Sequence, residues 1–292
     1  MKKNQSIGEV FISFIITSVL IIFSLLCFLP FWNILVSSFA STETITRNPF
    51  LIIPREINLS GYKYIFSAST LLRSIRVSAF ITIVGTFINM SLTAATAYPL
   101  SRKQVKGKNA IQFCIVFTML FSGGMIPTFL VVRATGLFNS LWALMIPSAI
   151  SAFNLVIMKN FFDQIPLELE ESAKIDGCND FIIWLRIILP VSTAVLATLT
   201  IFYGVSNWNS YFNAILYIND SDKWTVQIVL RQVVVMASGG VGDLSAMDPD
   251  FVVPSKTVQM GTIIIATLPI IAIYPFAQKY FVKGALLGSI KG

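Results

Sequence analysis

The sequence predicts an all-α membrane protein with several transmembrane helices, and three observations support this fold class. First, 55% of the 292 residues are hydrophobic and only 12% are charged, with a mean hydropathy of +0.77. Soluble domains usually have about a quarter of their residues charged, so the surplus of apolar side chains has to face lipid. Second, apolar runs of about 20 residues recur along the chain. Third, a charged segment, residues 163–190, lies between two of these runs and has to lie in water.

The first apolar run covers residues 10–35 and follows Lys2 and Lys3. A secretory signal has a shorter apolar core of about 7–15 residues, whereas a membrane span needs about 20. We therefore expect an uncleaved first span. Residues 38–40, Ser-Phe-Ala, faintly resemble a cleavage site, so removal of this segment is the alternative.

The second span is predicted over residues 77–100, and its polar residues share one helical face. They follow one another in steps of four, three, four and three: Thr82, Thr86, Asn89, Thr93 and Thr96. Within a membrane such a face turns toward protein or toward a water-filled path. Two interpretations stay open: packing between helices through small polar side chains, and the lining of a path for a solute.

Four further spans are expected, over residues 110–132, 141–162, 191–216 and 257–276. In the third span, Ser122-Gly123-Gly124 followed by Pro127 predicts a kink or a break. The fourth span contains Pro147. The second half of the fifth span is so polar that either protein and water surround it or the helix ends early.

The distribution of basic residues predicts the orientation. The densest basic cluster is the short loop 101–109, which the positive-inside rule assigns to the cytoplasm. With six spans and both termini inside, 12 of the 21 basic residues face the cytoplasm. Residues 37–76, with a short helix near 62–66, and residues 218–256 then form long external loops.

The charged segment combines a local charge anomaly with an ordered pattern. Residues 163–180 contain six acids and one base, a net charge of −5 in a chain of net charge +7. Pro166 and the following glutamates suit the start of a helix, and Gly177 can take the left-handed conformation that ends one. Asn179 can then cap a second helix over residues 180–189. The segment therefore predicts helix, glycine turn and helix on the cytoplasmic membrane surface.

The two helices are expected to face different surroundings. The second has an apolar face that is predicted to pack on the helix bundle, formed by Phe181, Trp184, Leu185 and Ile188. The first is predicted to present its acids and the small residues Ser172 and Ala173 to water or to a partner. The simpler interpretation, a solvated acidic loop, explains the charge but not the ordered pattern.

The same residues carry a resemblance. Glu171-Ser172-Ala173, then Gly177, then Ile188-Leu189-Pro190 resemble the EAA–G–ILP motif of permease subunits of binding-protein-dependent ABC importers. The pair Ile175-Asp176 resembles the corresponding pair in the motif of the carbohydrate-uptake branch of these permeases, the family that includes the permeases of the maltose importer. Supporting similarities are found in residues 136–147, Trp208-Asn209 and the ending Gly-Ser-Ile-Lys-Gly at 288–292. The departures from the motif, Ser172 and Cys178 in place of alanine, are small.

The resemblance implies a single transmembrane permease domain over residues 1–292, with a core at 70–285 and a coupling-helix region at 163–190. In that family the helix 166–177 sits in a cleft of a cytoplasmic ATPase subunit and moves with it. The implied ATPase-coupling residues are Glu168, Glu171, Ser172, Ala173, Asp176 and Gly177. The implied partners are a second permease, two ATPase subunits and an external solute-binding protein that delivers a sugar or oligosaccharide. The implied location is the bacterial cytoplasmic (inner) membrane, which the chain crosses several times.

No catalytic site is expected in the chain itself. It has no histidine, its three cysteines are dispersed, and it lacks the G-x-x-x-x-G-K-[ST] phosphate loop. ATP and Mg²⁺ are therefore expected on the partner ATPase, and no metal or cofactor on this chain. The basic residues lie at span ends and form no patch for nucleic acid. A permease for a non-sugar solute is one alternative, and an ion-coupled carrier is disfavoured because no acid lies at the centre of a span.

Aromatic and amide side chains are the expected lining of a sugar path, because rings stack on sugar faces and amides bond to hydroxyls. The candidate residues are Asn89, Thr93, Tyr203, Asn207, Trp208, Asn209, Tyr211 and Asn213. The alternative for Trp208 and Tyr211 is a place in the aromatic belt near the membrane surface.

Overall fold

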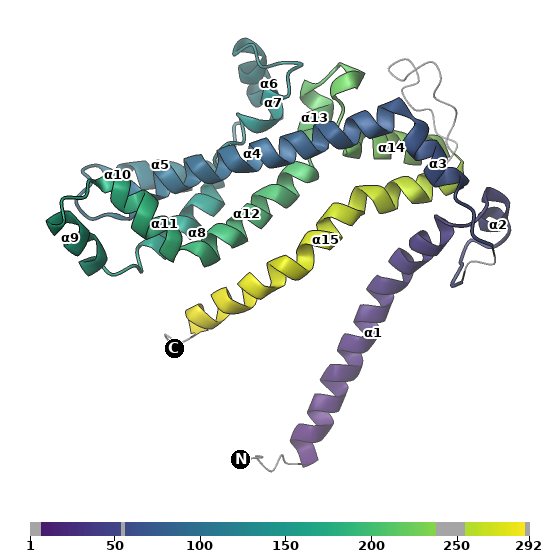
Figure 1. Cartoon of the computed structure of the whole chain (residues 1–292), viewed down its shortest axis with the longest axis horizontal. Helices are drawn as coiled ribbons and strands as arrows, with labels where there is room; N and C mark the ends of the chain where they lie inside the picture. The colour runs from purple at the N-terminus through teal and green to yellow at the C-terminus, as the bar shows by residue number, and fades with distance from the viewer. Residues whose placement is uncertain (1–6, 54–55, 238–254, 290–292) are drawn as a thin grey trace. The chain divides into compact units, whose positions relative to one another are not determined.

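The computed structural model describes residues 7–53, 56–237 and 255–289, and every regular element in these ranges is a helix. The helices, coloured along the chain in Figure 1, belong to two compact units. The first unit comprises Met1–Ser69, Leu230–Leu244 and Pro249–Thr267, and the second comprises Thr70–Val229, Ser245–Asp248 and Leu268–Gly292. The prediction of an all-α chain is confirmed for the described residues.

The first unit begins with the helix α1, Ile7–Ser37, which agrees with the predicted first span. Two short helices follow, α2 (Thr42–Arg47) and α3 (Ser60–Ser67). Only a short helix near residues 62–66 was expected here. The helix α2 is explained by its cap, because the Ser41 side chain accepts a hydrogen bond from the backbone N–H of Thr44.

Close packing joins α3 to the start of α15, Lys256–Ser289, within the first unit. A Cβ on Gly61 would lie 2.8 Å from the Thr257 side chain, and a Cβ on Gly261 would lie 2.9 Å from Ile65. The hydroxyl of Thr257 donates to the carbonyl of Ala40 at 3.0 Å. Glycine at these two positions therefore lets the helices approach closely.

The second unit is organised around α4, Ser69–Ser101, which begins earlier than the predicted second span at residue 77. The remaining helices of this unit that lie before its charged segment are α5 (Lys108–Leu120), α6 (Met125–Ala134), α7 (Trp142–Met145) and α8 (Ala152–Phe162). After that segment come α12 (Thr193–Trp208), α13 (Phe212–Tyr217), η2 (Ser221–Lys223) and α14 (Val226–Ala237), which continues into the first unit.

Two predicted spans are interrupted. The third is broken at Gly123-Gly124, where Gly124 has a φ of 89°, and α5 and α6 make an angle of 119°. The fourth was expected as one helix over residues 141–162 and is two helices, because Pro147 cannot continue α7 and Ser151 caps a new helix, α8. The break in the third span was predicted, and the continuous fourth span was wrong.

The helix of the fifth span ends before residue 216, which confirms the second of the two interpretations of its polar half, an early end of the helix. The helix α12 stops at Trp208, and α13 follows after a turn. The sixth helix, α15, continues past residue 276 to Ser289, with Pro269 and Pro275 inside it. The loop predicted at 218–256 contains α14, and its residues 238–254 lie outside the described ranges.

By length and composition, α1, α4 and α15 are each able to cross a membrane within the described part of the chain. If each of two bent helix pairs counts as one span, the number rises to five. The six-span arrangement remains a prediction. Both termini, and with them Lys2, Lys3 and the ending at 290–292, lie outside the described residues.

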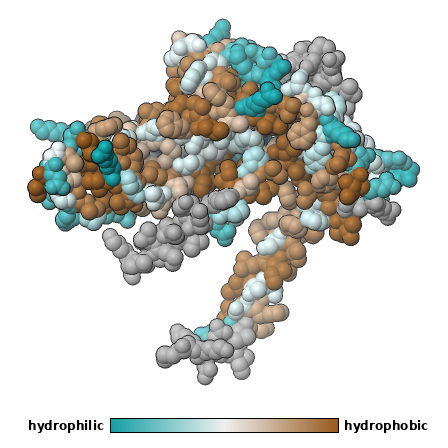
Figure 2. Space-filling view, viewed as in Figure 1, coloured by the Kyte–Doolittle hydropathy of each residue, from teal (hydrophilic) through white to brown (hydrophobic). Residues whose placement is uncertain are grey.

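An apolar core holds together the helices of the second unit at the end that carries the charged segment. Buried residues come from α4, α8 and α12, together with residues of the charged segment, and include Ala97, Phe162 and Leu199. Figure 2 shows hydrophilic surface, in teal, beside hydrophobic surface, in brown, at this same end of the unit, where α9 (Glu168–Ile175) and α10 (Asp180–Ile183) lie. The charged segment therefore has one side in the core and one side open.

Candidate functional site

The charged segment forms the predicted helix, glycine turn and helix. The first helix is α9, Glu168–Ile175, with three acids in its first turn. Gly177 has a φ of 83°. Its N–H donates to the carbonyl of Lys174, and the N–H of Cys178 donates to the carbonyl of Ala173, both at 3.0 Å. This pair of bonds is the Schellman arrangement that ends a helix, so the predicted role of Gly177 in the backbone is confirmed.

The cap of the second helix is also confirmed. The Asn179 side chain accepts a hydrogen bond of 2.9 Å from the N–H of Ile182, at the start of α10, Asp180–Ile183. The exposed pair Lys174 and Asp180, at 3.0 Å, connects the two helices across the turn. Two caps and one ion pair therefore fix the angle between α9 and α10.

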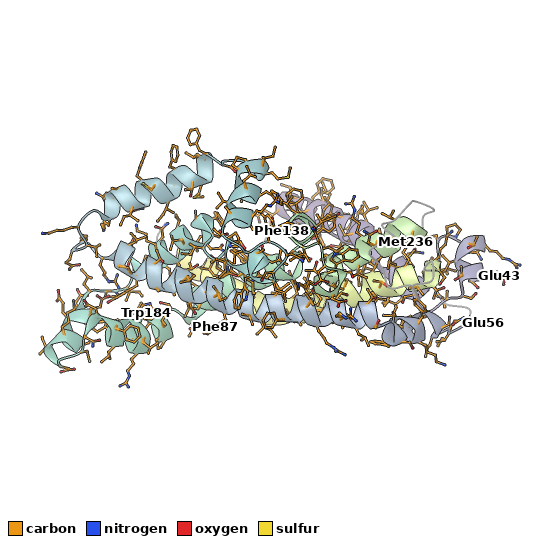
Figure 3. All side chains as sticks on the ribbon, turned by 90° about the horizontal axis from the view of Figure 1, so that it is seen from above. Glu43, Glu56, Phe87, Phe138, Trp184 and Met236 are labelled. Atoms are coloured by element: carbon orange, nitrogen blue, oxygen red, sulfur yellow. The ribbon has the colours of Figure 1, made fainter. Side chains whose placement is uncertain are left out.

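The second helix buries only part of the predicted face. Ile188 is fully buried, as predicted, whereas Phe181 and Leu185 are 64% and 48% exposed and Ile183, which was not predicted, is fully buried. The reason is a π-helical turn, η1 (Trp184–Ile188), which leads into α11, Leu189–Val191. Pro190 has no N–H and its ring crowds the carbonyl four residues earlier, which favours the wider turn and rotates the buried face. Trp184, labelled in Figure 3, is half-buried, as expected for the original face.

The helix α9 has one buried side, formed by Glu170 and Ala173, which are 5% and 7% exposed. Ala173 packs in the apolar core of the second unit. The expectation that Ala173 faces water or a partner is therefore wrong, because a side chain of one methyl group lets the helix lie close to the core. Glu170 forms an ion pair with Arg102 and accepts a hydrogen bond from the Tyr98 hydroxyl at 3.3 Å.

The opposite side of α9 is open. Of the predicted coupling residues, five are exposed: Glu168, Glu171, Ser172, Asp176 and Gly177. Three large apolar side chains on the same segment are exposed as well, Ile175 at 87%, Leu169 at 41% and Leu167 at 39%. Large apolar side chains exposed on a segment outside the apolar spans are typical of an interaction surface, and the acids give this surface a negative charge. The apolar part of this surface was not predicted.

Four of the candidate path residues form two hydrogen-bonded pairs between α4 and α12, which are together called the buried network. The amide of Asn207 donates to Asn89 at 3.0 Å, and Asn89 donates to the carbonyls of Ser148 and Ala149, each at 2.9 Å. Thr93 and Tyr203 share a hydrogen bond of 2.7 Å. All four side chains are buried. These contacts are the helix packing that was one interpretation of the polar face of α4.

The other four candidates lie at or beyond the end of α12. Trp208 is its last residue and is buried, whereas Asn209 and Asn213 are exposed and Tyr211 is half-buried. Asn209 accepts a hydrogen bond from Gln227 at 3.3 Å. The eight candidates therefore do not form one site in this chain.

Beside the network, the second unit has two open hollows in apolar surroundings. One, of about 480 Å³, is lined by residues that include Thr82, Thr86, Met90 and Gly204. The other, of about 170 Å³, includes Thr82, Trp208 and Pro269. The path interpretation of the polar face thus keeps support at Thr82, which lines both hollows, whereas Thr86 lines one of them and also accepts a hydrogen bond from Asn207 at 3.2 Å.

No metal centre is evident among the described residues, which contain no group of three or more His, Cys, Asp or Glu side chains arranged to hold an ion. The thiols of Cys27, Cys114 and Cys178 are all free.

No protein-family model matches the chain, but individual proteins do. It is 51% identical to the polygalacturonan/rhamnogalacturonan transport system permease protein YtcP of Bacillus subtilis, over 94% of this chain and 96% of that protein. It also resembles a chain of a bacterial ABC transporter involved in the import of the acidic polysaccharide alginate, with 29% identity and a TM-score of 0.87, over 96% of this chain and all of that one. A chain of an alginate ABC transporter solved with its alginate pentasaccharide-bound periplasmic protein shares the fold, at 13% identity, a TM-score of 0.60 and coverage of 92% and 93%.

These similarities define the class: the chain is a permease subunit of an ABC transporter, a membrane protein. More narrowly, it belongs to the family of carbohydrate ABC importer permeases, as its EAA-type motif had indicated.

Proposed function

We propose that the chain carries an acidic oligosaccharide across the cytoplasmic membrane, and that α9 couples this transport to an ATPase. The observation that carries the coupling is the two-sided structure of α9. One side is fixed in the core of the permease, while the other exposes acids and Ile175. A helix that is held on one side and open on the other is suited to transmit the movement of a bound partner.

The substrate class is supported by the relatives. Polygalacturonan and rhamnogalacturonan, named for the first relative, both contain galacturonic acid, and alginate, named for the solved transporter, is a polymer of uronic acids. A related permease would meet sugar chains that carry many carboxylates. Within this chain, candidate contacts are the open hollow beside Thr82 and Thr86 and the exposed Asn209 and Asn213.

The complete transporter would contain further subunits. ATP and Mg²⁺ would be bound by two cytoplasmic ATPase subunits, since this chain has no phosphate loop. A second permease would complete the path, and an external binding protein would deliver the sugar. We propose six spans with both termini in the cytoplasm, which places α9 on the ATPase side.

Replacing Glu171 by Lys tests the coupling surface. The change reverses a charge on the open side of α9 and leaves the buried pair of Glu170 untouched. Loss of one partner of a charge pair that is buried and hydrogen-bonded at an interface costs about 2–5 kcal/mol, so we expect at least a tenfold weaker association if the bound ATPase buries Glu171. Copurification of the ATPase with the tagged permease, and uptake by cells, are the measurements.

Lys106→Glu is the matched control, because it reverses an exposed charge on the 102–107 loop outside α9. We expect this variant to keep the ATPase bound. Normal ATPase association and uptake in Glu171→Lys would contradict the coupling role of α9.

The substrate class is tested with the purified transporter in liposomes, with its binding protein. We expect ATP-dependent uptake of labelled oligogalacturonides, and little uptake of neutral oligosaccharides of the same length. Preferred uptake of a neutral sugar, or of a solute that is not a sugar, would overturn the acidic class.

A further inference from the structure

We propose that the buried ion pair between Arg102 and Glu170 is the link through which α9 moves α4. Glu170 lies on the closed side of α9, and Arg102 directly follows the last residue of α4. The inference rests on the proposed function, because it takes α9 as the helix that an ATPase moves.

The pair is enclosed and held by further contacts. The two side chains are 8% and 6% exposed. The guanidinium of Arg102 also donates to the carbonyl of Phe162, the last residue of α8, at 3.1 Å, and to the hydroxyl of Ser101 at 3.0 Å. It lies 4.9 Å from the centre of the Tyr98 ring, whose hydroxyl donates to Glu170. One carboxylate is thereby tied to the ends of two helices.

The pair is also the main polar attachment of α9. This helix, which the structure describes completely, buries only Glu170 and Ala173. Ala173 contributes a single methyl group, and a small shift of this group along the apolar core would cost little free energy. An ion pair with additional hydrogen bonds has a defined geometry, and its separation would leave charges buried without partners. The ends of α4 and α8 therefore have to follow a displacement of α9.

The helix α4 can carry such a displacement into the membrane. It is continuous from Ser69 to Ser101 and contains Asn89 and Thr93 of the buried network. At 1.5 Å per residue, Asn89 is about 20 Å from Arg102 along the axis. A shift at the end of α4 thus reaches the contacts that join it to α12 and to the break before α8.

The test uses the complete transporter in liposomes with its binding protein and an oligogalacturonide. Glu170→Gln removes the charge at nearly constant volume and leaves the open side of α9 intact. Lys159→Gln is the matched control. It removes another ion pair, which Lys159 in the last turn of α8 forms with Asp163, just after that helix, at 2.6 Å. The double variant Glu170→Arg with Arg102→Glu reverses the pair and tests for rescue.

The decisive readout is the number of sugar molecules imported per ATP hydrolysed. A purely structural role would lower the amount of transporter and leave this ratio unchanged. We expect Glu170→Gln to retain the ATPase and to lower the ratio about fivefold or more, in the range of typical coupling energies. The control is expected to keep the ratio of the wild type, and the reversed pair to recover part of it.

A wild-type ratio in Glu170→Gln would overturn the inference. If this variant does not accumulate in the membrane, Tyr98→Phe replaces it, because it removes only the hydroxyl that donates to Glu170. In Tyr98→Phe we expect the number of sugar molecules imported per ATP to fall about twofold, as for the loss of one hydrogen bond. An unchanged ratio in this variant would also overturn the inference. Failure of the proposed function would differ from both results, since the wild-type transporter itself would then show no ATP-driven uptake of the oligogalacturonide.

Discussion

The helices α1 and α4 have nearly the same length, 31 and 33 residues, but their surroundings differ. No side chain in the most apolar window of α1 is buried, whereas 39% of the corresponding window of α4 is buried. The difference follows from composition. The apolar surface of α1 is uniform, whereas α4 has a polar face whose hydrogen bonds are made within the chain. Thus α4 is part of the core of the second unit, whereas α1 is exposed along its apolar window within the first unit.

Among substitutions that test this difference between α4 and α1, the largest loss of stability is expected at Asn89. Replacement by Leu leaves the carbonyls of Ser148 and Ala149 without their donor and removes an acceptor from Asn207. Each unpaired buried group costs about 1–3 kcal/mol, so we expect a loss of about 2 kcal/mol or more. Thermal unfolding in detergent measures this loss. Phe87→Leu is the control, since Phe87, labelled in Figure 3, is 73% exposed on the same helix; an equal loss in both variants would contradict the role of the network.

A smaller effect is expected at Gly85, also on α4. A Cβ there would lie 3.0 Å from the Asn207 amide and 3.3 Å from the Met145 side chain. Crowding of a packed site costs about 1–3 kcal/mol, and the better helix propensity of Ala returns about 1 kcal/mol. We therefore expect Gly85→Ala to lower stability by about 1 kcal/mol, measured in the same unfolding assay. Higher stability than the wild type would contradict this expectation and show that the Asn207 side chain can move away from the added methyl group without losing its hydrogen bonds.

The smallest effect is expected on α1. Leu20 is 59% exposed, so Leu20→Ala removes no packing within the chain, and the stability of the detergent-purified subunit should change by less than about 0.5 kcal/mol. The same comparison in the assembled transporter distinguishes lipid from protein as the cover of α1. A clear loss of stability only in the complex would show that another subunit packs against this helix.

Local signals made much of the candidate site predictable. Gly177 and Asn179 act on their own backbone neighbours, so their positions in the sequence were enough to predict the turn and the cap. The break at Gly123-Gly124 was predictable for the same reason.

Features that depend on distant partners were not predictable. Glu170 looked like the other acids of α9, because its partner Arg102 lies 68 positions earlier in the sequence, just after α4, and was counted only as one base of the loop 101–109. The buried face of the second helix was misassigned at Phe181 and Leu185, since a π-helical turn changes the period on which the prediction depended. The fourth span is divided because Pro147 ends α7 and the Ser151 side chain caps α8. Either residue alone is also found within continuous spans, so the sequence did not decide between one helix and two.

The exposed Ile175 has a consequence for the life of the subunit before assembly. Ile175 is 87% exposed and Leu169 is 41% exposed, on a segment outside the apolar spans. In the proposed assembly the ATPase covers these side chains, so a newly made permease without it would expose them to chaperones, proteases and other copies of itself. Under this proposal, balanced synthesis of the subunits protects the permease from aggregation and degradation.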